Sequence, residues 1–149
     1  MKKLLLIIAV ILCAACLAEA AGRELSGYYG QDIAQAAEEL GGLTYAAGEE
    51  YADNYQSDAV ALRGNGGKVA VIELKDAPGG DSLCGVRVGM ARRDVEALMD
   101  GCPQLWQYDE EIAYTVRADA KDELNNETLV VFFDELGLVN GAWYRASAV

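Results

Sequence analysis

The sequence contains no histidine, and this absence excludes several kinds of functional site. Without an imidazole there is no Ser-His or Cys-His nucleophile pair, and the usual nitrogen ligand of zinc and iron sites is missing. No glycine-rich phosphate loop follows a candidate strand, so nucleotide binding has no support. We therefore expect no metal ion and no cofactor.

Basic residues are also scarce, because 12 Lys and Arg face 24 Asp and Glu and give a net charge of −12. A chain of this charge repels nucleic acid and anionic membrane surfaces, so we expect neither as a partner. The same acidity can simply keep an exported protein in solution. A length of 149 residues with 52% hydrophobic residues is enough for one compact domain.

Residues 1–20 have the three parts of an export signal. Lys2 and Lys3 precede an apolar run over 4–17, and small residues follow it up to Ala20. The run is short for a permanent transmembrane helix. We predict a signal peptide over 1–20 and a protein exported from a bacterial cell, either secreted or periplasmic.

A second way of processing this signal involves Cys16. Ala14 and Ala15 precede Cys16, as at the end of a bacterial lipobox, although Cys13 stands where that pattern usually has Leu. Lipidation of Cys16 would anchor the chain to a membrane, which is the only membrane contact that we expect. The alternative is that both cysteines are small apolar residues of a discarded peptide.

Hydrophobic periodicity predicts two helices and six strands. Ile33, Ala36, Ala37 and Leu40 have helical spacing within 31–40, and a second amphipathic helix covers 91–101. Asn65-Gly66-Gly67 is typical of a tight hairpin turn. The predicted strands cover 57–63, 68–75, 84–88, 112–117, 128–133 and 138–144.

The two helical stretches also resemble each other. Aligning Gly30 with Gly89 matches Leu40 with Met99, and antiparallel strands follow both helices. We therefore predict an α+β fold built from a duplicated helix-plus-antiparallel-strands unit, with both helices packed on one face of a curved antiparallel sheet. It would form a single domain over 21–149, with repeats at about 28–76 and 83–145. Chance similarity between two amphipathic helices is the alternative.

Cleavage after Ala20 leaves Cys84 and Cys102 as the remaining cysteines. An even pair in an exported protein suggests a disulfide. A helix that folds back along the strand 84–88 would bring them to the same level, and the bridge would add ~3 kcal/mol of stability. Their spacing fits neither a CxxC motif nor a zinc knuckle.

Carboxylates are the only reactive groups present in quantity, and a glycosidase needs only two of them at the correct separation. Here they lie in expected turns and loops, where solvation explains them, so we expect no enzyme activity and no catalytic residue. The larger aromatic residues of the second half form either a binding face or the core and its rim. They are Trp106, Tyr108, Tyr114, Trp143 and Tyr144.

Residues 85–95, GVRVGMARRDV, resemble a recurring motif of exported proteins. In that motif a V-x-x-G-M-T-x-x-[ED]-V stretch opens a helix, and it occurs in small outer-membrane-assembly lipoproteins and, as tandem copies, in β-lactamase-inhibitory-protein-like domains. Ala91 stands where the motif prefers a hydroxyl residue. The resemblance implies a scaffold that binds other proteins, and it implies no enzyme activity and no particular target.

Together these features predict an exported, non-enzymatic domain that binds another protein at the cell envelope or outside it. The alternatives are a membrane-tethered envelope assembly lipoprotein, which depends on Cys16, and a small carboxylate-dependent hydrolase.

Overall fold

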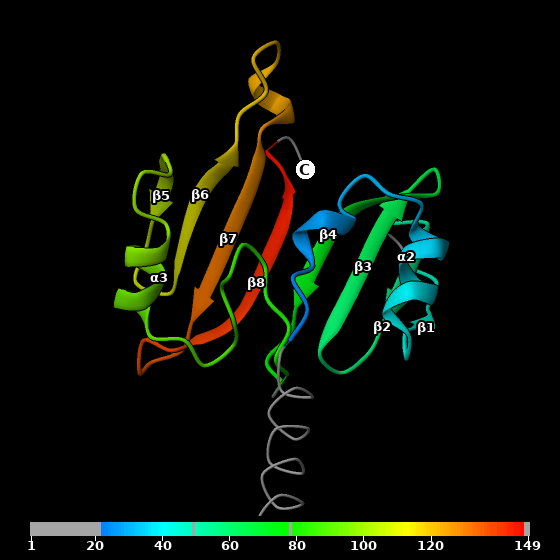
Figure 1. Ribbon diagram of the computed structural model, residues 1–149, viewed down its shortest axis with the longest axis horizontal. Helices are drawn as coiled ribbons and strands as arrows, with labels where there is room; N and C mark the ends of the chain where they lie inside the picture. Colours follow the sequence, from blue (N-terminus) through cyan, green and yellow to red (C-terminus); the bar gives the residue numbers. More distant parts are fainter. Residues whose placement is uncertain (1–21, 49, 78, 148–149) are drawn as a thin grey trace, which may run out of the picture.

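The described residues of the computed structural model, 22–48, 50–77 and 79–147, form one eight-stranded antiparallel sheet (Figure 1). The strand order is β1-β2-β3-β4-β8-β7-β6-β5, so β4 and β8 meet in the middle while β1 and β5 are the edges. The strands are β1 (Thr44–Tyr45), β2 (Asp53–Gln56), β3 (Val60–Asn65), β4 (Lys68–Leu74), β5 (Gln104–Gln107), β6 (Glu111–Arg117), β7 (Glu127–Phe133) and β8 (Val139–Ala146). The predicted signal peptide and Cys16 lie outside these residues.

The turn between β3 and β4 lies where the sequence predicts it. Gly66 and Gly67 have φ values of 68° and 76°, in the left-handed region that glycine occupies without steric cost. The amide N–H of Gly67 donates a hydrogen bond to Asp53 Oδ2 at 3.1 Å, which joins the turn to β2. This hairpin prediction is confirmed.

Two short α-helices accompany the sheet, and both lie within predicted helical ranges. Helix α2 (Ile33–Leu40) begins after Asp32, whose side chain accepts a hydrogen bond from the amide of Gln35, and it buries the four apolar residues that the periodicity selects. Helix α3 (Arg92–Leu98) follows Ala91, which offers no side-chain cap, and only Val95 is buried within it. Helix α3 thus lacks the side-chain capping hydrogen bond that α2 has, and it buries fewer apolar side chains than α2 does.

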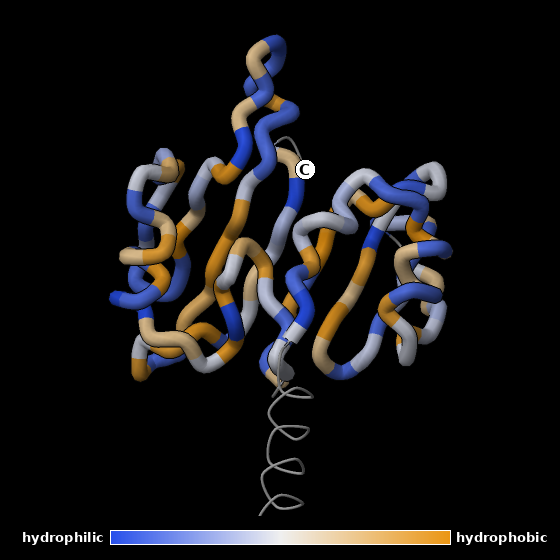
Figure 2. The backbone as a smooth tube through the Cα atoms, viewed as in Figure 1, coloured by the Kyte–Doolittle hydropathy of each residue, from blue (hydrophilic) through white to orange (hydrophobic). Residues whose placement is uncertain are grey.

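The main core lies on one face of the sheet. Its central row of cross-strand neighbours is at most 5% exposed and consists of Leu62, Ile72, Tyr144, Leu129 and Tyr114. We call this side the core face. Figure 2 shows the corresponding hydrophobic strands, in contrast to the mostly polar loop between β6 and β7.

The N-terminal segment 22–31 helps to close the middle of the core face. Leu25, just before the short 3₁₀ helix η1 (Ser26–Tyr28), is fully buried, and its amide donates to the Ser82 carbonyl at 2.9 Å. The amide of Gly30 donates to the Val69 carbonyl at 2.8 Å. This segment and the loop after β4 are therefore attached to each other and to the central strands.

The predicted fold class is wrong. The described chain is β-rich, because one sheet of eight strands dominates it and its two α-helices have only 8 and 7 residues. We predicted an α+β fold made of a duplicated unit with helices packed on the sheet. That prediction overestimated how much of the chain is helical. Irregular segments do much of the covering, and their apolar residues, such as Leu25 and Leu83, have no helical or strand period.

The predicted strand over 84–88 is also absent from the described fold. Leu83 and Val86 form only an isolated bridge and exchange two backbone hydrogen bonds, so the chain turns back on itself there. Conversely, β1, β2 and β5 are strands that the sequence did not predict. They have two to four residues each, which is too short for an alternating pattern to be recognised.

Candidate protein-binding face

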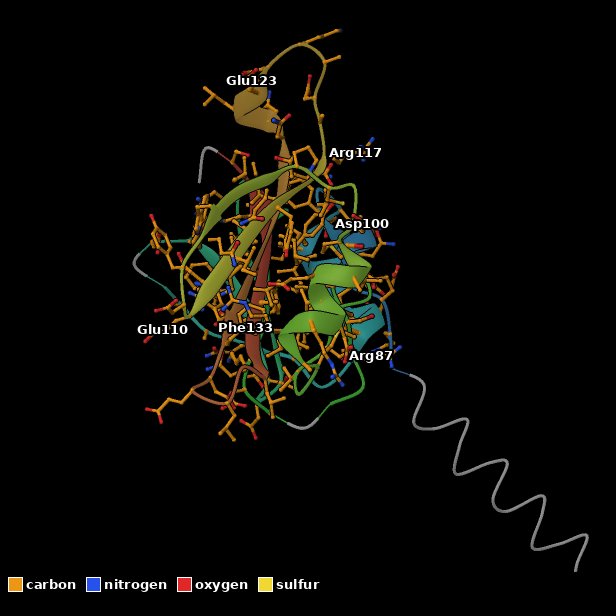
Figure 3. The ribbon with its side chains drawn as sticks, turned by 90° about the vertical axis from the view of Figure 1, so that its left-hand side faces the viewer. Arg87, Asp100, Glu110, Arg117, Glu123 and Phe133 are labelled. Atoms are coloured by element: carbon orange, nitrogen blue, oxygen red, sulfur yellow. The ribbon has the colours of Figure 1, made fainter. Side chains whose placement is uncertain are left out.

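Side chains that alternate with the core residues point to the opposite side of the sheet, which we call the open face. Its central row of cross-strand neighbours is Ala61, Glu73, Trp143, Val130, Ala113 and Trp106. The next row is Arg63, Val71, Arg145 and Thr128. Figure 3 views the sheet from the β5 edge, with Arg87 and Asp100 on one side of the strands and Glu110 on the other.

Trp143 is the centre of an aromatic cluster on the open face. Its side chain is 37% exposed, and its ring packs edge to face against Phe132 with 5.1 Å between the ring centroids. The guanidinium carbon of Arg145 lies 5.8 Å from the same ring. Val130, paired with Trp143 on β7, is only 2% exposed. A partly exposed indole on a buried apolar floor, beside an arginine, has the composition of an interface anchor.

Trp106 is the second tryptophan of the same row. Its indole Nε1 donates a hydrogen bond to Glu111 Oε1 at 2.8 Å, which holds the half-buried ring in place. Three strand spacings separate it from Trp143, or about 14 Å. Between the two tryptophans lie Val130 and Ala113, both buried. The open face therefore has an apolar centre with a fixed aromatic side chain at each end.

Beside Trp143 the open face contains a cavity of about 90 Å³. Its lining residues are Glu50, Tyr51, Arg63, Val71, Trp143 and Arg145. Tyr51, in the loop between β1 and β2, is 8% exposed, and burial raises the pKa of its hydroxyl, which Glu50 raises further and Arg145 and Arg63 lower. The loop therefore brings the Tyr51 side chain to the two arginines.

The strand alternation divides the predicted aromatic binding face. Trp106 and Trp143 lie on the open face, whereas Tyr114 and Tyr144 belong to the core and are each 5% exposed. Tyr108 lies just after β5 and is 64% exposed. Two of the five predicted residues therefore share the face that is open to a partner.

The polar members of this face, Arg63, Glu73 and Arg145, were not predicted from the sequence, and neither was Phe132. A usable pattern was present: Arg63, Glu73 and Arg145 each alternate with apolar residues that belong to the core. That period of two indicates a second, more polar face. It does not indicate which residues of distant strands become neighbours.

The predicted disulfide is not formed in this structure, where Cys84 and Cys102 both have free thiols and are half-buried. The expected geometry required a strand over 84–88, and a turn occupies that place. Cys84 has φ 51°, the only positive value of a non-glycine residue in the described ranges. Burial, together with the neighbouring Glu24 carboxylate, raises the pKa of the Cys84 thiol to about 11, so the thiol is neutral at pH 7 and a poor nucleophile.

Glu24 fixes this turn to the N-terminal segment. Its Oε1 accepts hydrogen bonds from the amides of Ser26 and Cys84, and its Oε2 accepts from the Gly85 amide and the Ser82 hydroxyl, all between 2.9 and 3.0 Å. Burial by itself would raise the pKa of Glu24, but these hydrogen bonds lower it below its ordinary value. The carboxylate has a structural role.

A separate cleft of about 340 Å³ opens beside Cys84 on the core side. Its lining includes Tyr29, Arg117, Glu127 and Tyr144. The Tyr144 hydroxyl donates a hydrogen bond to Glu127, and burial and this bond raise the pKa of Tyr144. Arg117 Nη1 lies 3.2 Å from Glu127 Oε1. The Glu127 carboxylate is therefore engaged by two partners within the protein.

Other acidic residues considered for a hydrolase have similar structural partners. Asp119, Asp122 and Asp134 accept hydrogen bonds from nearby backbone amides in their own turns, and Glu111 binds the Trp106 indole. Within the ranges that the structure describes, no group of three or more Cys, Asp or Glu side chains could hold a metal ion. These carboxylates support the chain's own turns and pairs.

Comparison with known proteins gives a likeness of fold alone. No family model matches the sequence, and no curated protein matches it. A solved structure described as an extracellular protein containing an SCP domain, from Bacillus anthracis strain Ames, is similar with a TM-score of 0.55 and 12% sequence identity. The similarity covers 86% of this chain and 47% of that one, so this chain spans about half the length of its structural neighbour.

Among the helices that the structure describes, none has the length and apolar character needed to cross a membrane.

Proposed function

We propose that this chain is an exported, non-enzymatic domain that binds another protein through its open face. The observation that carries the proposal is the Trp143 cluster, in which an exposed indole, Phe132 and Arg145 lie together on a buried apolar floor. The few residues that contribute most of the binding energy at protein interfaces are enriched in Trp, Tyr and Arg. The export signal over 1–20 and the resemblance of residues 85–95 to envelope scaffold proteins support the same function.

Further support comes from the groups that an enzyme would need. The Cys84 thiol is protonated at pH 7, and Glu24 and Glu127 are both occupied by hydrogen bonds within the protein. The extracellular character of the similar Bacillus anthracis protein agrees with export.

Site-specific crosslinking in the producing cell tests this proposal. A photoreactive phenylalanine replaces Trp143 in one variant and Tyr45 in a control variant, because Tyr45 is aromatic and 54% exposed but its cross-strand neighbour Tyr55 pairs with the core-face residue Leu62. We expect position 143 to give one dominant protein adduct that position 45 does not give. We also expect Trp143→Ala to weaken binding to that protein at least tenfold. Equal adducts from both positions, or none from position 143, would contradict the proposal.

A membrane-tethered assembly lipoprotein is the second candidate, and it rests on the Ala14-Ala15-Cys16 sequence. The intact mass of the mature protein from its own host separates the two candidates. A chain that begins at Cys16 with added acyl mass supports the lipoprotein, and a chain that begins at Ala21 supports a free binding protein.

A further inference from the structure

The cavity beside Trp143 contains a cationic group whose Nε has no hydrogen-bond partner. The Arg145 Nε–H is buried, and no oxygen atom among the described residues accepts a hydrogen bond from it. A buried donor without an acceptor costs roughly 1–3 kcal/mol, and more for a charged group. An acceptor that binds at Arg145 Nε would therefore remove this cost from the free protein.

The strands on either side of Arg145 do not supply that acceptor. On β4 its cross-strand neighbour is Val71, which is apolar. On β7 its neighbour is Thr128, whose hydroxyl is hydrogen-bonded to the Ser147 hydroxyl at 2.8 Å. Neither cross-strand neighbour therefore offers an acceptor to Arg145 Nε.

Arg63 provides an internal comparison within the same cavity. Its guanidinium forms an ion pair with Glu73, the neighbouring acid on β4, so that both charges are neutralised. Glu50, the acid among the lining residues of the cavity, is exposed at the loop. In a chain with a net charge of −12, Arg145 is therefore a local cation whose Nε–H, although buried, has no acceptor among the described residues.

The size and chemistry of the cavity favour a carboxylate. A volume of about 90 Å³ holds a few water molecules or one small planar group. A guanidinium binds a carboxylate through two parallel hydrogen bonds, and the Trp143 ring beside it limits access of water. A doubly charged phosphate would face stronger repulsion than a carboxylate from Glu50 at this site.

We propose that this cavity receives a carboxylate group of the partner protein, with Arg145 as the bidentate donor and Trp143 packed beside it. This inference rests on the proposed function and adds the chemical group that the partner presents. The carboxylate belongs either to an Asp or Glu side chain or to the partner's C-terminus.

Nuclear magnetic resonance on the ¹⁵N-labelled mature protein from its own host tests this proposal without the partner. The Arg145 Nε–H and Trp143 indole N–H signals are followed during addition of sodium acetate, N-acetylaspartate methylamide as a side-chain mimic, or N-acetylglycine as a C-terminal mimic. Sodium chloride at equal ionic strength is the control. We expect saturable shifts of both signals at millimolar carboxylate, and a much smaller shift of the Arg63 signal.

Two variants of Arg145 and one of Arg63 sharpen the result. Arg145→Gln should abolish the saturable shift of the Trp143 signal, whereas Arg63→Gln should leave it. Arg145→Lys, which keeps the charge but loses the planar fork, should weaken binding at least threefold. Dispersed backbone signals verify that each variant is folded. Shifts no larger than those with chloride, or full binding by Arg145→Gln or Arg145→Lys, would overturn the inference.

The two proposals can fail separately. A partner crosslinked through position 143 without any carboxylate binding would overturn the cavity inference and leave the proposed function in place. Carboxylate binding without a crosslinked partner would uphold the cavity chemistry and count against the proposed function.

Discussion

Trp143 and Tyr144 are adjacent in β8, but they lie in opposite environments. Tyr144 is 5% exposed in the core, and its hydroxyl is bound to Glu127, whereas Trp143 is 37% exposed on the open face. Separate segments of the chain, such as residues 22–31, cover the core face. On the open face, the strands' own large side chains shield small apolar neighbours such as Val130.

Residues of this one sheet are buried in two different ways. Core residues are buried by other elements of the fold, so removing one leaves a cavity. The floor of the open face is buried beneath side chains that remain in contact with solvent, so these side chains are available for a second molecule. Stability should therefore depend mainly on the first face, and binding on the second.

The largest expected effect is a difference in the free energy of unfolding between Ile72→Ala on the core face and Trp143→Ala on the open face. Ile72 is fully buried in the core, so its truncation should lower the free energy of unfolding by about 3 kcal/mol. Trp143→Ala loses an exposed ring and one aromatic pair, and should cost about 1 kcal/mol. Denaturant unfolding of the two variants measures both values. An equal loss in the two would mean that the faces do not differ as described.

A middle-sized effect is expected at Glu24, which attaches the covering segment to the loop at Cys84. Glu24→Gln should destabilise the protein by about 1 kcal/mol at pH 7, since an amide with one acceptor oxygen replaces the charged acceptor of four hydrogen bonds at an exposed position. Glu38→Gln, an exposed change on α2, is the control and should have little effect.

The same variant has a predicted pH dependence. Because the pKa of Glu24 in the folded protein lies below its ordinary value of 4.5, its stabilising effect is complete well above pH 4.5 and is lost as the pH falls through the folded pKa. The stability difference between the natural chain and Glu24→Gln should therefore shrink on acidification from pH 7 to pH 3. Thermal unfolding at several pH values checks this, and a constant difference would refute it.

The smallest effect concerns the helix starts. Ala91→Ser should stabilise the protein by about 0.5–1 kcal/mol, because Ala91 has the extended backbone of a helix cap but no side-chain acceptor. The opposite change, Asp32→Ala at the start of α2, removes an existing cap and should cost about 1 kcal/mol. Thermal unfolding resolves both changes. Destabilisation by Ala91→Ser would indicate that α3 is limited by something other than its cap.

Local periodicity predicted part of this fold. The i, i+3, i+4, i+7 spacing of Ile33, Ala36, Ala37 and Leu40 located α2 and its buried face. Alternation over residues 112–117 located β6, and Asn65-Gly66-Gly67 located a hairpin turn. In each case the pattern is contained within a few consecutive residues, so the sequence alone carries it.

The remaining features depend on contacts between distant residues. Leu25 and Leu83 are buried without any periodic neighbours, and the turn at Cys84 depends on Glu24, which is 60 positions away in the chain. The unpartnered Nε of Arg145 likewise follows from which strands became its neighbours. Assigning a helix or a strand to such segments led to the wrong fold class and to a predicted strand over 84–88 where the structure has a turn.

The two edges of the sheet have a consequence for aggregation. An exposed strand edge can recruit another strand from a second chain. Here β1 has only two residues, and the pairing of β5 with β6 is interrupted by an irregularity between Gln104 and Trp106. Short or bulged edges are poor templates for such strand addition. Even at high concentration, neither edge of the sheet thus offers a long regular strand that a second chain could extend into a fibre.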